Sequence, residues 1–204
     1  IICEYDKETG LFKELDSFNE KIKLTDVTKT SMNGVEKISK VLSFNRYGQK
    51  GIEFKEEADT ILELKEFLLK YGFPILVIQN AAFDMRYLNT RSEHRIHNEV
   101  LDTKQMLQLF YLPTLQKLAE TDPYCKDLIQ KIGTSDRDNG LISSSISKVG
   151  PSMGVDMSDY HDALSDCKYT ITILENMIKL INDNQDLDIR KYHSDRVSKI
   201  RNQR

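Results

Sequence analysis

A short, wholly apolar run near the middle of the chain, Ile75–Ile78, restricts the possible folds more than any other feature. Runs of this kind are typical of strands that are buried on both faces. The segment before it, residues 56–71, has apolar residues at helical spacing and is stopped by Gly72 and Pro74. A helix that leads into a doubly buried strand is a unit of an α/β fold. We therefore expect a mixed central sheet with helices on both faces.

The N-terminal residues have the pattern of a β-hairpin. Residues 1–5 and 11–24 are the expected strands, and Asp6-Lys7-Glu8-Thr9-Gly10 between them has the composition of a turn, with Gly10 at positive φ. The first residue is Ile, and the chain opens directly into this pattern without the charged segment of a signal peptide. We expect a chain that begins in this way to have been cut from a longer polypeptide.

Shorter patterns predict the remaining elements. The apolar pair Val100-Leu101 predicts a second strand, and a strongly amphipathic helix is expected after residue 161. Residues 113–158 are expected to be mostly irregular, with a loop at residues 133–140. Further helices are expected at residues 35–42, 85–89, 104–111 and 115–119. We predict one domain over residues 1–189, followed by a basic tail over residues 190–204 that frays.

Composition and charge limit the classes of function. A chain of 204 residues, of which 39% are apolar and 30% charged, is long enough for one well-packed domain. Its net charge of −3 does not indicate nucleic-acid binding, although basic residues can still gather on one face. No apolar run reaches the length of a transmembrane helix, so we expect no membrane partner. Three cysteines without metal-ligand spacing argue against zinc and favour a reducing, cytoplasmic compartment.

Two short motifs carry the candidate chemistry. The first, Asn80–Asp84, follows the apolar strand directly and places Asp84 near the start of the next helix. The second begins at His161 and ends at Asp166, where the amphipathic helix starts. Carboxylates hold Mg²⁺ or Mn²⁺, and a histidine can deprotonate water near neutral pH. Such a set is what metal-assisted phosphodiester hydrolysis requires.

Each motif also has an ordinary structural explanation. Acidic residues near helix N-termini, such as Asp84 and those after His161, cap backbone N–H groups and favour the positive end of the helix dipole. Asn80 is a common turn residue, and Phe83 is also consistent with a core position. Each motif taken separately leaves these alternatives open.

Taken together and in this order, the two motifs resemble the second and third motifs of the DEDDh, or DnaQ-like, 3′→5′ exonucleases. Asp102-Thr103, which ends the second apolar segment, resembles a further element of that family. The resemblance covers residues 1–182. It implies an RNase H-like fold, two divalent metal ions (Mg²⁺ or Mn²⁺) and release of nucleoside monophosphates from a 3′ end.

The resemblance also implies roles for individual residues. Asp84 and Asp166 match the positions of metal ligands, and His161 matches the general base. Asn80 and Phe83 match positions that lie along the substrate groove.

The same family has a first motif, Asp-x-Glu commonly followed by Thr and Gly, on its opening strand. In one interpretation, Asp6 and Glu8 belong to that motif. In the other, they lie in a hairpin turn, residues 1–24 are the second and third strands, and the motif lies upstream of Ile1. We favour the second, because only one convincing strand follows Gly10 where a working first motif should be followed by two. It predicts that residues 1–204 lack two of four metal-binding carboxylates and are inactive alone.

Three hypotheses about function follow. The first is a 3′→5′ exonuclease that acts on the 3′ end of single-stranded DNA in proofreading or end trimming, with a polymerase or replication protein as a possible partner. The second is a catalytically incomplete module that binds nucleic acid or a polymerase. The third is an oligoribonuclease-type enzyme that trims RNA.

Overall fold

The computed structural model describes residues 1–23, 53–92, 95–135, 140–159 and 162–201, and the expected helix at residues 35–42 lies outside them. The fold is mixed α/β. The strands form three two-stranded sheets in the described part of the chain, two antiparallel and one parallel. In chain order the strands are β1 (Ile2–Asp6), β2 (Leu11–Asp16), β3 (Leu76–Ile78), β4 (Val100–Asp102), β5 (Thr134–Ser135) and β6 (Leu141–Ile142).

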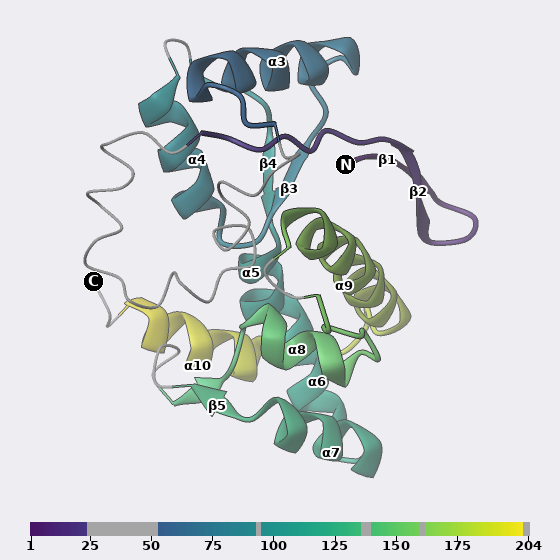
Figure 1. Ribbon diagram of the computed structural model, residues 1–204. Helices are drawn as coiled ribbons and strands as arrows, with labels where there is room; N and C mark the ends of the chain where they lie inside the picture. Colours follow the sequence, from purple (N-terminus) through teal and green to yellow (C-terminus); the bar gives the residue numbers. More distant parts are fainter. Residues whose placement is uncertain (24–52, 93–94, 136–139, 160–161, 202–204) are drawn as a thin grey trace.

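Helices make up most of the described structure. They are α3 (Glu57–Lys70), α4 (Ala81–Arg91), α5 (Thr103–Met106), the π-helical turn η2 (Leu107–Tyr111), α6 (Leu112–Leu118), α7 (Pro123–Ile132), α8 (Ile146–Ser152), α9 (Ala163–Asp183) and α10 (Arg190–Arg201). Figure 1 shows α5, α6, α8, α9 and α10 gathered on one side of the β3–β4 pair, with α3 and α4 on the other. In the described residues, no helix is both long enough and apolar enough to cross a bilayer.

The N-terminal hairpin forms as predicted, although its second strand ends at Asp16 instead of continuing to residue 24. Gly10 has φ +72°, and its N–H donates to the Asp6 carbonyl at 2.8 Å. The hairpin is joined to α9 by the Phe12 N–H, which donates to the Glu175 carboxylate at 2.7 Å. The turn composition therefore gives the predicted hairpin. Its position is held by the bond to Glu175 and by Asp16 of β2, whose carboxylate accepts the Lys70 ammonium and the Tyr71 hydroxyl.

The main hydrophobic core lies among the helices C-terminal to β4. Its members share nearly complete burial and include Leu107, Leu112, Leu115, Ile132, Val149, Ile173 and Met177. The π-helical turn η2 and α9 contribute side chains from sequence positions more than 60 residues apart. The long amphipathic helix expected after residue 161 is thus confirmed as a central packing element of the fold.

Two expectations about the second half of the chain are wrong. Residues 113–158, expected to be mostly irregular, include α6, α7 and α8 as well as β5 and β6. The basic tail does not fray over Arg190–Arg201 but forms α10, because Arg196 is only 1% exposed and donates to the Ile142 carbonyl at 2.7 Å. The basic composition does not indicate this helix, since the one deeply buried residue among those of α10 whose burial is described is a charged residue.

The apolar run at residues 75–78 forms a strand as predicted, but its expected burial on both faces is wrong. Ile75 is 59% exposed and Val77 is 36% exposed. The physical reason is the sheet itself, since β3 pairs with β4 alone in the described residues and its other edge has no strand beside it. A strand with an interior composition therefore occupies an edge.

Candidate functional site

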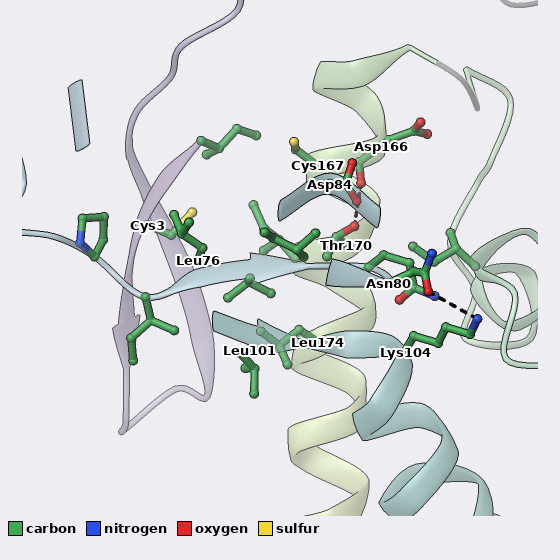
Figure 2. Close-up of a pocket in the computed structure, with 18 of the residues that line it drawn as sticks. Cys3, Leu76, Asn80, Asp84, Leu101, Lys104, Asp166, Cys167, Thr170 and Leu174 are labelled. Atoms are coloured by element: carbon green, nitrogen blue, oxygen red, sulfur yellow. Dashed lines mark hydrogen bonds between the residues drawn. The ribbon is translucent and has the colours of Figure 1, made fainter. Parts of the chain in front are cut away.

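A groove of about 1080 Å³ brings the two sequence motifs together (Figure 2). Its walls come from β1, β3, α3 and one side of α9, and most of its lining is apolar. Asn80 and Asp84 line it from the first motif, and Asp166 lines it from the second. In Figure 2 the labelled side chains of Asp84 and Asp166 lie at the same end of the groove. Residues 82 positions apart in the chain therefore share one site.

The position of Asp84 depends on a sharp change of direction after β3. Asn80 adopts the left-handed conformation (φ +66°, ψ +52°), which Asn tolerates better than most residues, and α4 begins at the next residue. Its side chain makes no cap hydrogen bond to α4. Asp102, at the end of β4, serves instead, because its carboxylate accepts the N–H groups of Asn80 at 3.1 Å and Ala81 at 3.0 Å. The turn is thus held by the neighbouring strand.

The same carboxylate also caps the helix that follows β4. Asp102 accepts the N–H groups of Lys104 at 2.9 Å and Gln105 at 3.4 Å, as an N-cap residue of α5. One side chain therefore secures the first turns of two helices whose strands lie side by side. Parallel strands bring their carboxyl ends to one edge of a sheet, which explains why a single residue reaches both.

A polar network lies behind this turn. Thr103, which is fully buried, donates to the Gln79 side chain at 2.6 Å. The amide group of Gln79 in turn donates to the Ser144 carbonyl at 3.2 Å. The network connects the end of β3 with the buried serines before α8, which also line the groove. These contacts make the Asp84 end of the groove a well-supported part of the fold.

Burial raises the pKa of the Asp84 carboxyl above its usual value, and the nearby charge of Asp102 raises it further. A carboxylate in this environment is partly deprived of water and faces a second negative charge. The charge of Asp102 favours a cation beside Asp84, whereas burial favours the protonated form of the carboxyl. Lys104, another lining residue, places its ammonium group 3.5 Å from the Asn80 side-chain oxygen and adds positive charge at the mouth of the same site.

Asp166 lies in the first turn of α9. The capping role there belongs to Asp162, whose carboxylate accepts both the N–H and the hydroxyl of Ser165 at 3.2 Å. The ordinary structural explanation for an acidic residue at this helix start therefore applies to Asp162, whereas Asp166 lines the groove.

The other predicted site residues have different positions. His161 lies outside the described residues. Phe83 does not line the groove and is 69% exposed, because consecutive helical residues point about 100° apart and Asp84 faces inward. Asp6 and Glu8 lie in the hairpin turn, also away from the groove, where the Asp6 carboxylate accepts the N–H of Glu8 at 2.8 Å. This position agrees with the turn interpretation of the Asp6–Gly10 sequence.

Two carboxylates from distant parts of the chain suit a hard cation such as Mg²⁺, which commonly binds through one or two carboxylates and keeps several waters. Among the described residues, no group of three or more His, Cys, Asp or Glu side chains is placed to hold a metal ion. Of the sequence-predicted metal ligands, Asp84 and Asp166 are the two that line the groove.

The sequence motifs give no role to the residues that support the site. Asp102 belongs to the Asp102-Thr103 element of the resemblance, which does not indicate its bonds to two helix starts. An Asp between an apolar strand and a helical pattern is an N-cap signal. The sequence therefore indicates that Asp102 caps α5, but not that it binds the start of α4. Thr103 bonds to Gln79, and Gln79 bonds to Ser144, which lies about 40 residues after Thr103 and 65 residues after Gln79. No local pattern in the sequence indicates these contacts.

No family model matches this chain, and comparison with curated proteins and with solved structures gives no significant match.

Proposed function

We propose that this protein is, or forms part of, a metal-dependent 3′→5′ exonuclease of the DEDDh type, with an RNase H-like fold, acting on the 3′ end of single-stranded DNA. The observation that carries the proposal is the shared groove, since Asp84 of the first motif and Asp166 of the second both line it. Side chains brought together from such distant positions are not explained by helix capping alone. The nearby negative charge of Asp102 adds an electrostatic reason to bind a cation there.

Each residue has a defined task in this proposal. Asp84 and Asp166 hold two divalent ions, Mg²⁺ or Mn²⁺, which when bound stabilise the attacking and leaving oxygens of the phosphodiester. His161 takes the proton of the attacking water. Asn80 and Lys104 contact the terminal nucleotide, and exposed Phe83 offers a surface on which a base can stack.

The test uses the full-length protein that contains residues 1–204, because these residues alone are predicted to be inactive, and a single-stranded DNA oligonucleotide labelled at its 5′ end, with Mg²⁺ or Mn²⁺. We expect stepwise shortening from the 3′ end, and loss of this activity in Asp84→Asn and Asp166→Asn. Asp186→Asn, which changes an exposed carboxylate between α9 and α10, is the matched control and keeps full activity. Equal rates in all three variants would refute the assignment. A matched RNA oligonucleotide separates the DNA enzyme from an oligoribonuclease-type RNA trimmer.

A second function is favoured by a specific observation. Asp6 and Glu8 lie in the hairpin turn, so the described residues bring two carboxylates to the groove instead of four. A chain with this set is expected to bind nucleic acid or a polymerase without cutting. Fluorescence anisotropy with the same DNA distinguishes the two, because the binding module gives a saturable signal while the DNA stays intact in Mg²⁺ and Mn²⁺.

A further inference from the structure

Helix α3 has apolar residues on two opposite sides. Its inner side, with Leu64, Phe67 and Leu68, lines the groove. On the other side Leu62 and Leu69 are each 58% exposed, and Figure 1 shows α3 at the edge of the molecule. The two leucines lie seven residues apart, which is close to two turns of a helix, so they share one line along its surface. A helix that is apolar on all sides is normally covered on all sides. The outer leucines of α3 therefore have the composition of a contact surface.

Two charged residues lie between these leucines. Lys65 follows Leu62 by three residues and Glu66 precedes Leu69 by three, so all four positions have the spacing of one helix side. We call these four residues the outer stripe. In the described part of the chain, neither Lys65 nor Glu66 takes part in an ion pair. The outer stripe thus has the order leucine, charge, charge, leucine from both ends, and only the signs of the central charges distinguish its two directions.

This pattern is complementary to its own reverse. When a second copy of the outer stripe lies antiparallel to the first, Leu62 faces Leu69 of the second copy and Lys65 faces Glu66 of the second copy. A two-fold axis repeats both contacts, as in any isologous interface. A parallel copy instead places Lys65 beside Lys65 and Glu66 beside Glu66, and like charges at such a distance repel. Charge complementarity therefore favours the antiparallel arrangement.

We infer that the outer stripe is a self-association surface, through which two copies of this chain pair antiparallel along α3. The two-fold axis lies between Lys65 and Glu66, which form two ion pairs with the second copy, and the leucines pack on both sides of them. The contact extends over the 14 residues of α3, a length of about 21 Å. An interface of this size is small, so the dimer dissociates in the micromolar range, at about 1–100 µM. The groove lies on the other side of α3 and takes no part in the contact.

The residue that follows the last turn of α3 supports a contact at this surface. Phe73 has φ +58°, a left-handed conformation that bulky residues rarely adopt, and it is 62% exposed. Backbone strain of this kind gathers at functional sites. In the antiparallel pair, this end of α3 lies beside the start of the second copy's helix, where Ala58 is small and exposed. An exposed aromatic residue and a small residue therefore lie at the same end of the contact.

The test measures the mass of the full-length protein that contains residues 1–204 by sedimentation, over a range of about 1–300 µM. We expect a monomer at low concentration and a dimer at high concentration. Leu62→Glu and Leu69→Glu each weaken the dimer by about tenfold or more, because the change occurs twice in every dimer. The matched control is Leu11→Glu, at a leucine of β2 that is 54% exposed, and it leaves the dimer unchanged. A monomer at every concentration, or equal effects of all three variants, overturns the inference.

Neutral variants of the central charges test the direction of pairing. Lys65→Gln and Glu66→Gln each remove two ion pairs from an antiparallel dimer, so each weakens it by about two- to tenfold at low salt. In a parallel dimer the same variants remove repulsion and strengthen the association. Strengthening, or no change, therefore overturns the antiparallel arrangement.

A pair of charge reversals tests the contact between the two charges. Lys65→Glu leaves four acidic side chains around the two-fold axis, and Glu66→Lys leaves four basic ones, so each variant alone associates more weakly than the original chain. A mixture of the two variants brings acidic residues opposite basic ones and restores the dimer. The double variant Lys65→Glu/Glu66→Lys also restores it, because the swapped charges are again complementary to their own reverse. Failure of both combinations to associate overturns the inference.

The self-association does not depend on the proposed function. Its readout is mass, in the absence of nucleic acid and metal ions, so failure of the nuclease assay does not affect it. Conversely, a monomeric protein that shortens DNA overturns the inference and leaves the proposed function intact.

Discussion

Replacing Asp102 by Ala should destabilise the fold more than any other single surface-accessible capping change. Its carboxylate accepts four backbone N–H groups, those of Asn80, Ala81, Lys104 and Gln105, at 3.1, 3.0, 2.9 and 3.4 Å. The first two belong to the turn that starts α4 and the last two belong to α5. The substitution therefore removes the acceptor for two helix starts at once.

The expected loss follows from these contacts. An N-cap replaced by Ala costs about 0.5–2 kcal/mol, and hydrogen bonds to a charged group contribute about 1.5–3 kcal/mol before any exposure to water is considered. Asp102 is half-buried and its bond to Gln105 is long, so we expect a net loss of about 2–4 kcal/mol for Asp102→Ala. Asp102→Asn keeps one acceptor oxygen and should lose about half of that amount.

Urea unfolding followed by circular dichroism measures this loss as a change in midpoint at constant slope. The control is Asp122→Ala, which removes an N-cap of one helix only, since Asp122 accepts the Tyr124 N–H at 2.8 Å at the start of α7. We expect about 1 kcal/mol for the control. If Asp102→Ala costs no more than Asp122→Ala, the claim that one carboxylate secures both helix starts is wrong.

Two further predictions concern a groove residue and the tail. Burial and the charge of Asp102 raise the pKa of Asp84, so the folded state binds the proton more tightly than the unfolded chain. Asp84→Asn should therefore gain stability relative to the original chain at pH 7, and this gain should vanish as the pH falls below the ordinary value of 3.8, as urea titrations across pH 3–7 would measure. Arg196→Met should lose about 2–3 kcal/mol, because a buried carbonyl bond to Ile142 is lost, whereas Arg190→Ala, at a mostly exposed ion pair, should change the thermal midpoint very little.

Local patterns predicted several elements of this fold correctly. The turn residues before Gly10 predicted the hairpin, Gly72 and Pro74 predicted the end of α3, and the spacing of apolar residues predicted α9. In each case the determining interactions lie within a few residues of the chain. The same locality explains the capping role of Asp162, which is formed with a residue three positions away.

Features that depend on distant partners could not be predicted in this way. α10 is anchored by an arginine whose acceptor lies 54 residues earlier, and the composition of the tail indicates only a solvated segment. The inward direction of Asp84 and the outward direction of Phe83 depend on how Asp102 fixes the turn at Asn80. Such contacts are set by tertiary packing. The sequence therefore predicts the motif residues Asp84 and Asp166, but not the residues, such as Asp102, that hold them in position.

The structure differs from the sequence-based expectations in two ways at β3 and its carboxyl end. The strand β3 has the composition of an interior strand but lies at an edge, and the site at its carboxyl end holds two carboxylates where the resemblance implies four. The first departure follows from backbone pairing, because β3 has one strand partner among the described residues. The second follows from the hairpin turn, which keeps Asp6 and Glu8 away from the groove.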